Sequence, residues 1–138
     1  MSVEENKALY WRIYDNILNK GNLSIIDEFV APNYIYHDPH NPLNSPDELK
    51  QGMSAYRTAF PDMRFTVEEM VAEGDKVVKR WKLVGTHKGE LMGIAPTGKE
   101  VTVTGISMGR FANGKLAEEW EAADMLGLMQ QLGAIPSE

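Results

Sequence analysis

Hydrophobic and polar residues first alternate with the period of an α-helix. Between Glu4 and Asn19, apolar side chains recur at helical spacing, which predicts an amphipathic helix, and Lys20-Gly21 is a typical helix end. A shorter helix with the same period is expected from Asn22 to Phe29. The residues from Tyr34 to His37 then alternate strictly, which favours a short strand.

A third helix has the clearest start in the chain. Ser45 can cap it, Pro46 suits the first helical position, and Glu48 completes the pattern of a capping box. We expect this helix to continue to about Ala59 and to end before Pro61.

Beyond the third helix the hydrophobic period changes to that of a strand. Alternating segments run from Arg64 to Ala72 and from Lys76 to Thr86, with a turn signal at Gly74-Asp75 between them. A glycine-rich connection, His87 to Gly98, leads to a further pair of strands, and Met125 to Leu132 closes as a short amphipathic helix. Helices followed by consecutive antiparallel strands indicate an α+β fold, in which N-terminal helices cover one curved sheet.

The strongest local signal is Asn113-Gly114 between the last two alternating runs. Both central residues of a type I′ turn need positive φ, so this pair predicts a two-residue hairpin turn. Counting from the turn places Ala112 opposite Lys115 and assigns ten side chains to one face. That face combines large apolar side chains, glycines and other small residues that leave space, and two acids. This combination predicts a lined pocket. The ten residues are Val103, Gly105, Ser107, Gly109, Phe111, Leu116, Glu118, Trp120, Ala122 and Asp124.

The opposite face of this hairpin mixes apolar and polar side chains. Ile106 and Met108 are its apolar members. A half-polar sheet surface of this kind can form a wet interface with a second subunit. We therefore expect a homodimer, or a tetramer, that uses the outer sheet face. The polar members of this face are Thr102, Thr104, Arg110, Glu119 and Glu121.

Composition and charge exclude several classes of function. The 138 residues suffice for one domain, residues 1–138, with a proper core. A net charge of −6 with dispersed Lys and Arg argues against a nucleic-acid partner. No apolar run has the length of a membrane span, so no membrane partner is expected. The chain has no cysteine and its N-terminus has no signal-peptide pattern, which makes cytoplasmic localisation the default expectation.

Several short motifs occur in an order that is typical of one known family. They are Ala59-Phe60-Pro61-Asp62, Ala72-Glu73-Gly74-Asp75-Lys76-Val77-Val78, Arg80-Trp81, Gly85-Thr86-His87-Lys88-Gly89, Pro96-Thr97-Gly98-Lys99, Arg110-Phe111, Gly114-Lys115-Leu116, Glu118 with Trp120, and Gln131-Leu132-Gly133. In these motifs the chain resembles the SnoaL-like polyketide (ester) cyclase family, within the superfamily that includes nuclear transport factor 2 and ketosteroid isomerase. The resemblance implies a cone-shaped, strongly curved antiparallel sheet closed by helices, with a hydrophobic pocket in its mouth.

The resemblance also implies a chemistry. The characterised cyclases close a ring by an intramolecular aldol reaction of a polyketide ester, without a metal or an organic cofactor. An aspartate removes a proton from a carbon beside carbonyl groups, and Asp124 best matches that aspartate here. His37 and His87 resemble polar residues at the pocket mouth of the family. The implied partner is a small, largely apolar carbonyl compound.

Each candidate on the hairpin has a structural alternative. Asp124 could deprotonate a carbon acid among apolar walls, or it could cap the helix that follows it. Glu118 could donate a proton in the pocket, or serve only as the ion-pair partner of a nearby Lys or Arg. Trp120 is expected to be a wall of the pocket rather than a catalyst, together with Val103 and Phe111.

The histidines and tyrosines leave further alternatives. His37 is the second catalytic candidate, as a general acid or an enolate donor near neutral pH, and His87 is a candidate pocket contact. Tyr14 on the first helix could donate to an enolate, or could belong to the core. His37 with His40 is a poor metal pair, because a proline lies between them and no third ligand follows at a standard spacing, so no metal is expected.

Three functions remain open at the level of sequence. The leading expectation is an enzyme that performs cofactor-independent acid/base chemistry, polyketide-cyclase-like, on a small, largely apolar carbonyl compound. The second is isomerase, hydratase or hydrolase chemistry in the same pocket. The third is a non-catalytic protein that binds a hydrophobic metabolite. Fold alone does not choose among them.

Overall fold

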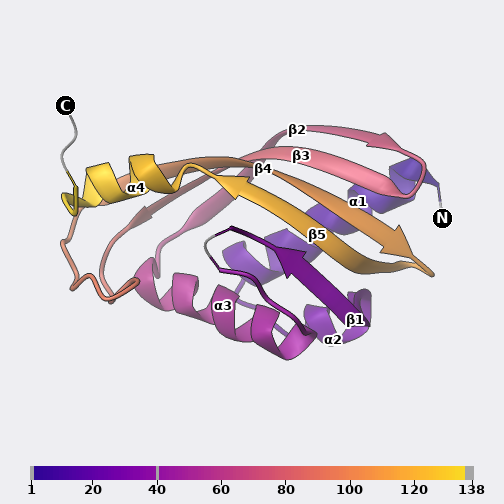
Figure 1. Cartoon of the computed structure of the whole chain (residues 1–138), viewed down its shortest axis with the longest axis horizontal. Helices are drawn as coiled ribbons and strands as arrows, with labels where there is room; N and C mark the ends of the chain where they lie inside the picture. Colours follow the sequence, from indigo (N-terminus) through magenta and orange to yellow (C-terminus); the bar gives the residue numbers. More distant parts are fainter. Residues whose placement is uncertain (1, 40, 136–138) are drawn as a thin grey trace.

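The computed structural model describes residues 2–39 and 41–135 (Figure 1). Its elements follow the expected order of helices, then strands, then a closing helix. In chain order they are α1 (Val3–Tyr14), a π-helical turn (Asp15–Asn19), α2 (Ile25–Phe29), β1 (Val30–His37), α3 (Pro46–Ala59), β2 (Arg64–Glu73), β3 (Lys76–Thr86), β4 (Glu100–Ala112), β5 (Lys115–Ala123) and α4 (Met125–Leu132).

The strands form one open sheet in the order β1-β5-β4-β3-β2. Strands β2 to β5 pair antiparallel with their neighbours in the sequence, whereas β1 pairs parallel with β5. The expected α+β fold with a curved sheet is therefore confirmed, and β1 departs from a purely antiparallel arrangement. β1 enters directly from α2 and leaves toward α3, so no hairpin ties it to an antiparallel partner.

The first helix is capped at its start and fastened to the sheet at its end. Ser2 Oγ accepts a hydrogen bond from the backbone N–H of Glu5, whose carboxylate accepts one from the N–H of Ser2. The expected helix from Glu4 to Asn19 thus begins one residue earlier and finishes as a π-helical turn. The Asn19 side chain exchanges hydrogen bonds with the backbone of Phe65, which holds the end of the helix against β2.

Helix α3 begins and ends where its sequence predicts. Ser45 Oγ accepts from the N–H of Glu48 at 3.1 Å. The Glu48 carboxylate accepts from the N–H of Asn44 rather than from that of Ser45, so the capping box is completed one residue outside its usual place. α2 begins at Ile25, later than expected, and ends at Phe29 as expected.

The Asn113-Gly114 turn is confirmed, but the register beyond it changes. Both turn residues have positive φ, 54° and 75°, and Ala112 pairs with Lys115. A bulge at Ala117 then shifts the pairing, so that Arg110 lies opposite Glu118. A shift by one residue moves every later side chain to the other face of the strand. The face expected for the second half of this hairpin is therefore wrong: Glu119 and Glu121 point inward.

The helices position the core and leave one sheet face outside. α1 packs against β2 and β3, α3 against β1, and α4 against β4 (Figure 1). Apolar side chains of these helices and of the inner sheet face form one continuous core. Within residues 2–39 and 41–135, every helix is too short or too polar to span a lipid bilayer.

Candidate active site

A largely apolar cavity lies between the helices and the inner sheet face. It has a volume of about 680 Å³ including its open mouth. Aromatic rings supply much of its wall. The lining residues are Tyr14, Leu18, Tyr36, Asp38, Met53, Tyr56, Phe60, Phe65, Lys79, Trp81, Leu83, Val103, Glu121, Ala123, Met125 and Leu128.

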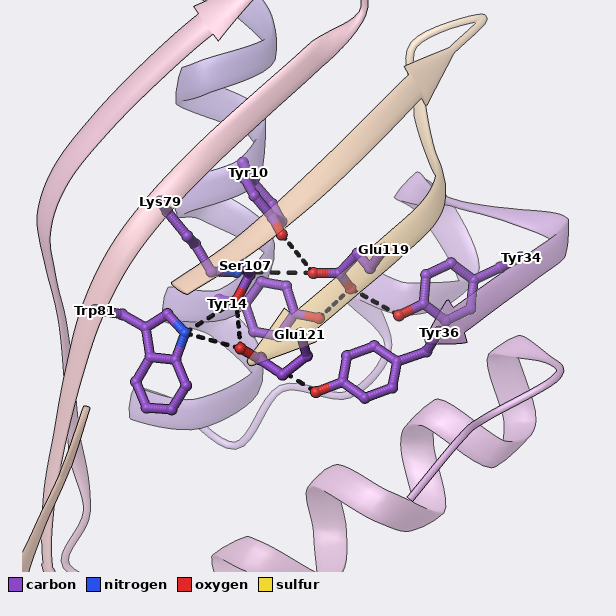
Figure 2. Close-up of polar contacts among 9 residues, drawn as sticks. All are labelled: Tyr10, Tyr14, Tyr34, Tyr36, Lys79, Trp81, Ser107, Glu119 and Glu121. Carbon is purple, nitrogen blue, oxygen red and sulfur yellow. Dashed lines mark hydrogen bonds and ion pairs between the residues drawn. The ribbon is translucent and has the colours of Figure 1, made fainter. Parts of the chain in front are cut away.

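Three polar side chains form one row across the sheet beneath this cavity (Figure 2). Lys79 on β3 pairs with Ser107 on β4, and Ser107 pairs with Glu121 on β5. Directly opposed residues of neighbouring strands project to the same face, so all three point inward. An ammonium, a hydroxyl and a carboxyl group are thereby held in fixed order on an otherwise apolar surface.

Glu121 is an acid in direct contact with the cavity. One carboxylate oxygen accepts hydrogen bonds from Ser107 Oγ at 2.8 Å and from Trp81 Nε1 at 3.2 Å, and the other accepts from Tyr36 Oη at 3.1 Å (Figure 2). Burial raises the pKa of Glu121 to about 7, although the charge of Lys79 acts in the opposite direction. A carboxyl group that ionises near neutral pH can both take and return a proton.

A second acid, Glu119, lies on the same strand face and is fully buried. It accepts hydrogen bonds from Tyr10 Oη at 2.5 Å, from Tyr34 Oη at 2.6 Å and from Tyr14 Oη (Figure 2). Lys79 Nζ lies 3.8 Å from Glu119 Oε2. Three phenol donors and an ammonium group match the acceptor sites of a carboxylate, so the hydrogen-bonding capacity of this buried acid is satisfied.

Lys79 is the only charged partner of Glu119 among the described residues, and it is 1% exposed. Its Nζ lies 3.4 Å from the ring centroid of Tyr14 and 3.7 Å from that of Tyr10, which adds cation–π attraction. Burial lowers the pKa of Lys79 to about 8, and the charge of Glu119 opposes this effect. Burial, and after it the charge of Glu119, raise the pKa values of Tyr10 and Tyr14 far above the ordinary value of a phenol. Both phenols therefore remain hydrogen-bond donors.

The small residues of β4 make room for aromatic rings. A Cβ at Gly105 would lie 2.3 Å from Cζ2 of Trp81, and a Cβ at Gly109 would lie 3.0 Å from Cζ of Tyr10. Gly105 therefore lets the Trp81 indole reach Glu121, and Gly109 lets the Tyr10 ring pass over the sheet. The expectation that these missing side chains widen the cavity is wrong, because rings from β3 and α1 fill the space.

Tyr56 on α3 brings an uncommitted hydroxyl to the cavity wall. Its Oη makes no hydrogen bond to another residue within 2–39 and 41–135, and the ring lines the cavity. Burial raises the pKa of Tyr56, and the negative charges of Asp38 and Glu121 raise it further. The phenol therefore stays protonated and can donate to an oxygen atom of a ligand.

Asp124 does not reach the cavity. Its side chain is exposed and accepts a hydrogen bond from the N–H of Gly127 at 2.9 Å, which caps α4. Its own N–H donates to the carbonyl oxygen of Thr104. The expected pocket position of Asp124 is thus wrong, because the bulge at Ala117 reverses the faces of β5 and the capping geometry turns the carboxylate outward.

Glu118, Trp120 and His37 gather on the outer sheet face instead. The His37 ring stacks on Trp120 with centroids 5.2 Å apart, and His37 Nε2 lies 2.7 Å from Glu118 Oε2. Arg110 Nε donates to the other oxygen of Glu118 at 3.1 Å. The hydrogen bond to His37, and then that to Arg110, lower the pKa of Glu118. The expected pocket positions of these three residues are wrong for the same reason as that of Asp124.

The remaining candidates divide between the cavity and the core. Tyr14 and Val103 line the cavity. Phe111 is buried and packs edge-on against a tyrosine ring of α1, outside the cavity lining. His87 is fully buried beyond the lining, and its Nδ1 accepts from the N–H of Thr97 at 3.2 Å. His87 therefore anchors the connection between β3 and β4, and its expected pocket contact is wrong.

The residues suit no metal site in the part of the chain that the structure describes. Within residues 2–39 and 41–135, no three His, Asp or Glu side chains gather as a metal ion would require. His37 lies on the outer face. His40, the other member of the weak metal pair, lies outside the described residues.

Sequence reasoning missed the three residues that dominate the site, Glu119, Glu121 and Lys79. For Lys79 a signal was present, because it alternates with Val77 and Trp81 on a strand face that is otherwise apolar. A lysine at such a position has to be paired when it is buried. For the two acids no comparable signal exists, since their inward direction depends on the bulge.

Comparisons with known proteins give relatives of one kind. The chain is 26% identical to the nogalonic acid methyl ester cyclase of Streptomyces nogalater, and the match covers 83% of this chain and 88% of that one. It is 29% identical to the aklanonic acid methyl ester cyclase DnrD of Streptomyces peucetius, with 77% and 72% covered. Both relatives are named as cyclases.

Solved structures with the same fold include proteins of similar size. AclR of Streptomyces galilaeus, provisionally described as a hydroxylase, is 34% identical, with a TM-score of 0.88 and coverage of 99% of this chain and 86% of that one. A protein of Acidithiobacillus ferrooxidans, provisionally described as a polyketide cyclase, is 30% identical, with a TM-score of 0.84 and coverage of 97% and 99%.

A family model gives the assignment. The model described as SnoaL-like polyketide cyclase matches residues 8–132, which is nearly the whole chain. It spans the helices, the sheet and the cavity between them. The resemblance that the short motifs carried is confirmed, and the chain belongs to the SnoaL-like polyketide cyclase family.

Proposed function

We propose that this protein is an enzyme that closes a ring in a polyketide-type carbonyl compound by an intramolecular aldol reaction, with Glu121 as the base. The observation that carries the proposal is a carboxyl group, with a pKa of about 7, fixed by three hydrogen bonds in an apolar aromatic cavity. The relatives that are named as aklanonic and nogalonic acid methyl ester cyclases support this reaction class.

The reaction needs one proton carrier and no added atoms. The Glu121 carboxylate takes a proton from a carbon beside a carbonyl group, and the electron pair of that bond forms an enolate. The enolate carbon bonds to a second carbonyl carbon of the same molecule, whose electron pair moves to its oxygen. Protonated Glu121 then returns the proton to this alkoxide, so the product is an isomer of the substrate.

The cavity wall supplies the remaining requirements. Tyr56 Oη is free to donate to the enolate oxygen, where negative charge develops. The rings of Phe60 and Trp81 offer flat apolar surfaces that suit a fused aromatic substrate. Every step uses groups of the chain itself, so the proposal invokes no cofactor.

The test is turnover of aklanonic acid methyl ester by the wild-type chain and by Glu121→Gln. We expect the variant to lose activity by about 10²- to 10⁴-fold, because the amide cannot accept the proton. Wild-type kcat/KM should rise with pH up to about 7 and level off above it, because only ionised Glu121 is a base. Glu118→Gln is the matched control, since it changes an outward acid of the same strand. Full turnover by Glu121→Gln contradicts the proposal.

The similarity to AclR favours hydroxylation of a related compound as a second candidate function. Mass spectrometry of the product separates the two reactions. Ring closure by an aldol step leaves the mass unchanged, whereas hydroxylation adds one oxygen atom and needs an external oxidant. Isomerase, hydratase or hydrolase chemistry would give other products, and tight binding without turnover would favour a metabolite-binding protein.

We propose that two copies of the chain pair through the outer sheet face, on which Ile106 is 51% exposed and Ile35 is 41% exposed. Analytical ultracentrifugation measures this directly, and a monomer at micromolar concentration contradicts it. We also propose that the protein acts in the cytoplasm and does not bind nucleic acid.

A further inference from the structure

We propose that the buried ion pair of Lys79 and Glu119 is a positioning device that sets the charge state of Glu121. The inference rests on the proposed function, because it concerns how the base of that reaction is adjusted. Glu119 does not touch the substrate space: it is 0% exposed and absent from the cavity lining. Its influence on the reaction therefore has to act through neighbours that line the cavity, Glu121 and Lys79.

The sheet register places one charge of each sign beside Glu121. Lys79 stands in the same cross-strand row, separated from Glu121 by Ser107. Glu119 stands two residues away on the same strand face, and such side chains are about 7 Å apart. An anion at this distance disfavours ionisation of Glu121, and a cation favours it. The two neighbours thus push the same equilibrium in opposite directions.

Both charges of the pair are held in place by groups from other elements. Glu119 is fixed by hydroxyl groups from α1 and β1, namely those of Tyr10, Tyr14 and Tyr34. Lys79 Nζ is enclosed by two of the same rings. The cluster is therefore pre-organised by contacts from α1 and β1.

A contribution to folding stability does not explain why this ion pair is buried. Removing two charges from water costs several kcal/mol for each ion, and apolar residues of similar volume often serve as well or better. In this chain Lys79 occupies a position where β3 otherwise presents apolar side chains to the core, and Glu119 is fully buried on β5. Charges that are expensive to bury, beside an acid that faces the cavity, indicate an electrostatic role.

Among the other ionisable groups that face Glu121, the phenols keep their charge state in the relevant pH range, whereas Lys79, with a pKa of about 8, belongs to the proposed ion pair. The phenols remain protonated, because burial raises the pKa of each of them. The half-buried Asp38 is common to every variant proposed below. Within residues 2–39 and 41–135, these groups are Tyr10 and Tyr14 from α1, Tyr36 from β1, Asp38 from the residue after it, Tyr56 from α3, Lys79 from β3 and Glu119 from β5.

The experiment titrates Glu121 directly in the full chain, without a substrate. Carbon-13 in the glutamate carboxyl groups is followed by NMR, and the Glu121 signal is the one that disappears in Glu121→Gln. We expect Glu119→Gln to lower the midpoint of this titration by about one to two pH units, and Lys79→Met to raise it by a similar amount. Lys79→Met combined with Glu119→Gln should return it to within about half a unit of wild type.

The opposite signs distinguish this role from a merely structural one. A loosened core would shift the midpoint in the same direction in both single variants, and that result overturns the proposal, as does a change below about half a unit in both. If Glu119→Gln does not fold, the rise in Lys79→Met and its reversal in the double variant remain decisive. Lys82→Met is the matched control, because Lys82 lies on the outer face of β3 with Glu68 at 3.7 Å.

The proposed function and the proposed role of the ion pair can be contradicted independently of each other. The titration reports on the ion pair even if no substrate is turned over. If the reaction of the proposed function is correct, the pH profile of kcat/KM should move with the NMR midpoint in each variant. Full turnover by Glu121→Gln would remove the catalytic role of Glu121 and leave the measured coupling of the three charges intact.

Discussion

Glu119 and Glu121 are the same residue type on the same face of one strand, two positions apart, and their surroundings differ sharply. Glu119 meets three phenols and an ammonium group, with no access to the cavity. Glu121 meets a hydroxyl, an indole and one phenol, and it lines the cavity. The first carboxylate is locked by charge-assisted bonds, whereas the second sits where its proton can be exchanged with a ligand.

The hydrogen-bonding and charged partners of a buried acid determine its role more than the extent of its burial does. An ionised acid with an opposite charge and strong donors is fixed, and any change of its charge disturbs everything around it. An acid with weaker neutral donors has a raised pKa, and it can change charge near neutral pH. We infer a fixed structural acid at Glu119 and a working proton carrier at Glu121.

The largest expected difference between the two acids is in folding stability. Glu119→Gln leaves Lys79 buried without its counter-charge, so we expect it to lower the free energy of unfolding at pH 7 by about 3 to 5 kcal/mol. Glu121→Gln should not lower that free energy, because the amide resembles the neutral acid and removes the ionisation that burial opposes near this pH. Urea denaturation measures both values. Equal losses would contradict the division between a fixed and an exchangeable acid.

The pairing of the strands explains which parts of this picture the sequence could predict. Periodicity, turn residues and caps depend on local chemistry, so the helices, the strand order along the chain and the turn at Asn113-Gly114 were predictable. The inward set on β4, which includes Val103 and Ser107, followed by counting from that turn. The family resemblance added the cavity and its reaction class.

The acids of β5 could not be predicted by counting, because the bulge at Ala117 has no clear local signature. One additional residue reversed the assignment of Glu118 and Trp120 to the pocket and brought two acids of the expected outer face inside. The cluster around Glu119 joins residues that are 85 to 109 positions apart in the sequence. Such contacts arise from packing of distant elements, which local patterns do not report.

Glu121 should also make the free energy of unfolding depend on pH. Glu121 binds its proton more tightly in the folded chain, where its pKa is raised from 4.5 to about 7, so the folded state carries more protons between these values. Its stabilising contribution is therefore complete below pH 4.5 and is lost as pH rises to 7, by up to about 1.4 kcal/mol per pH unit. The difference in unfolding free energy between wild type and Glu121→Gln isolates this contribution. A difference that does not change with pH would show that Glu121 titrates normally.

The smallest expected effect concerns Asp124, the acid that the family resemblance first favoured. Asp124→Ala removes the hydrogen bond from the N–H of Gly127 to the cap of α4, which should cost about 1 kcal/mol of unfolding free energy. Turnover should remain within about twofold of wild type, because a surface substitution away from the reacting groups seldom alters the transition state. Asp124→Asn is the matched variant, since an asparagine keeps the cap and loses only the charge. If Asp124→Ala and Asp124→Asn both abolish turnover while the chain stays folded, the base lies at Asp124, and the bulge that turns it outward must be reversible when a substrate binds.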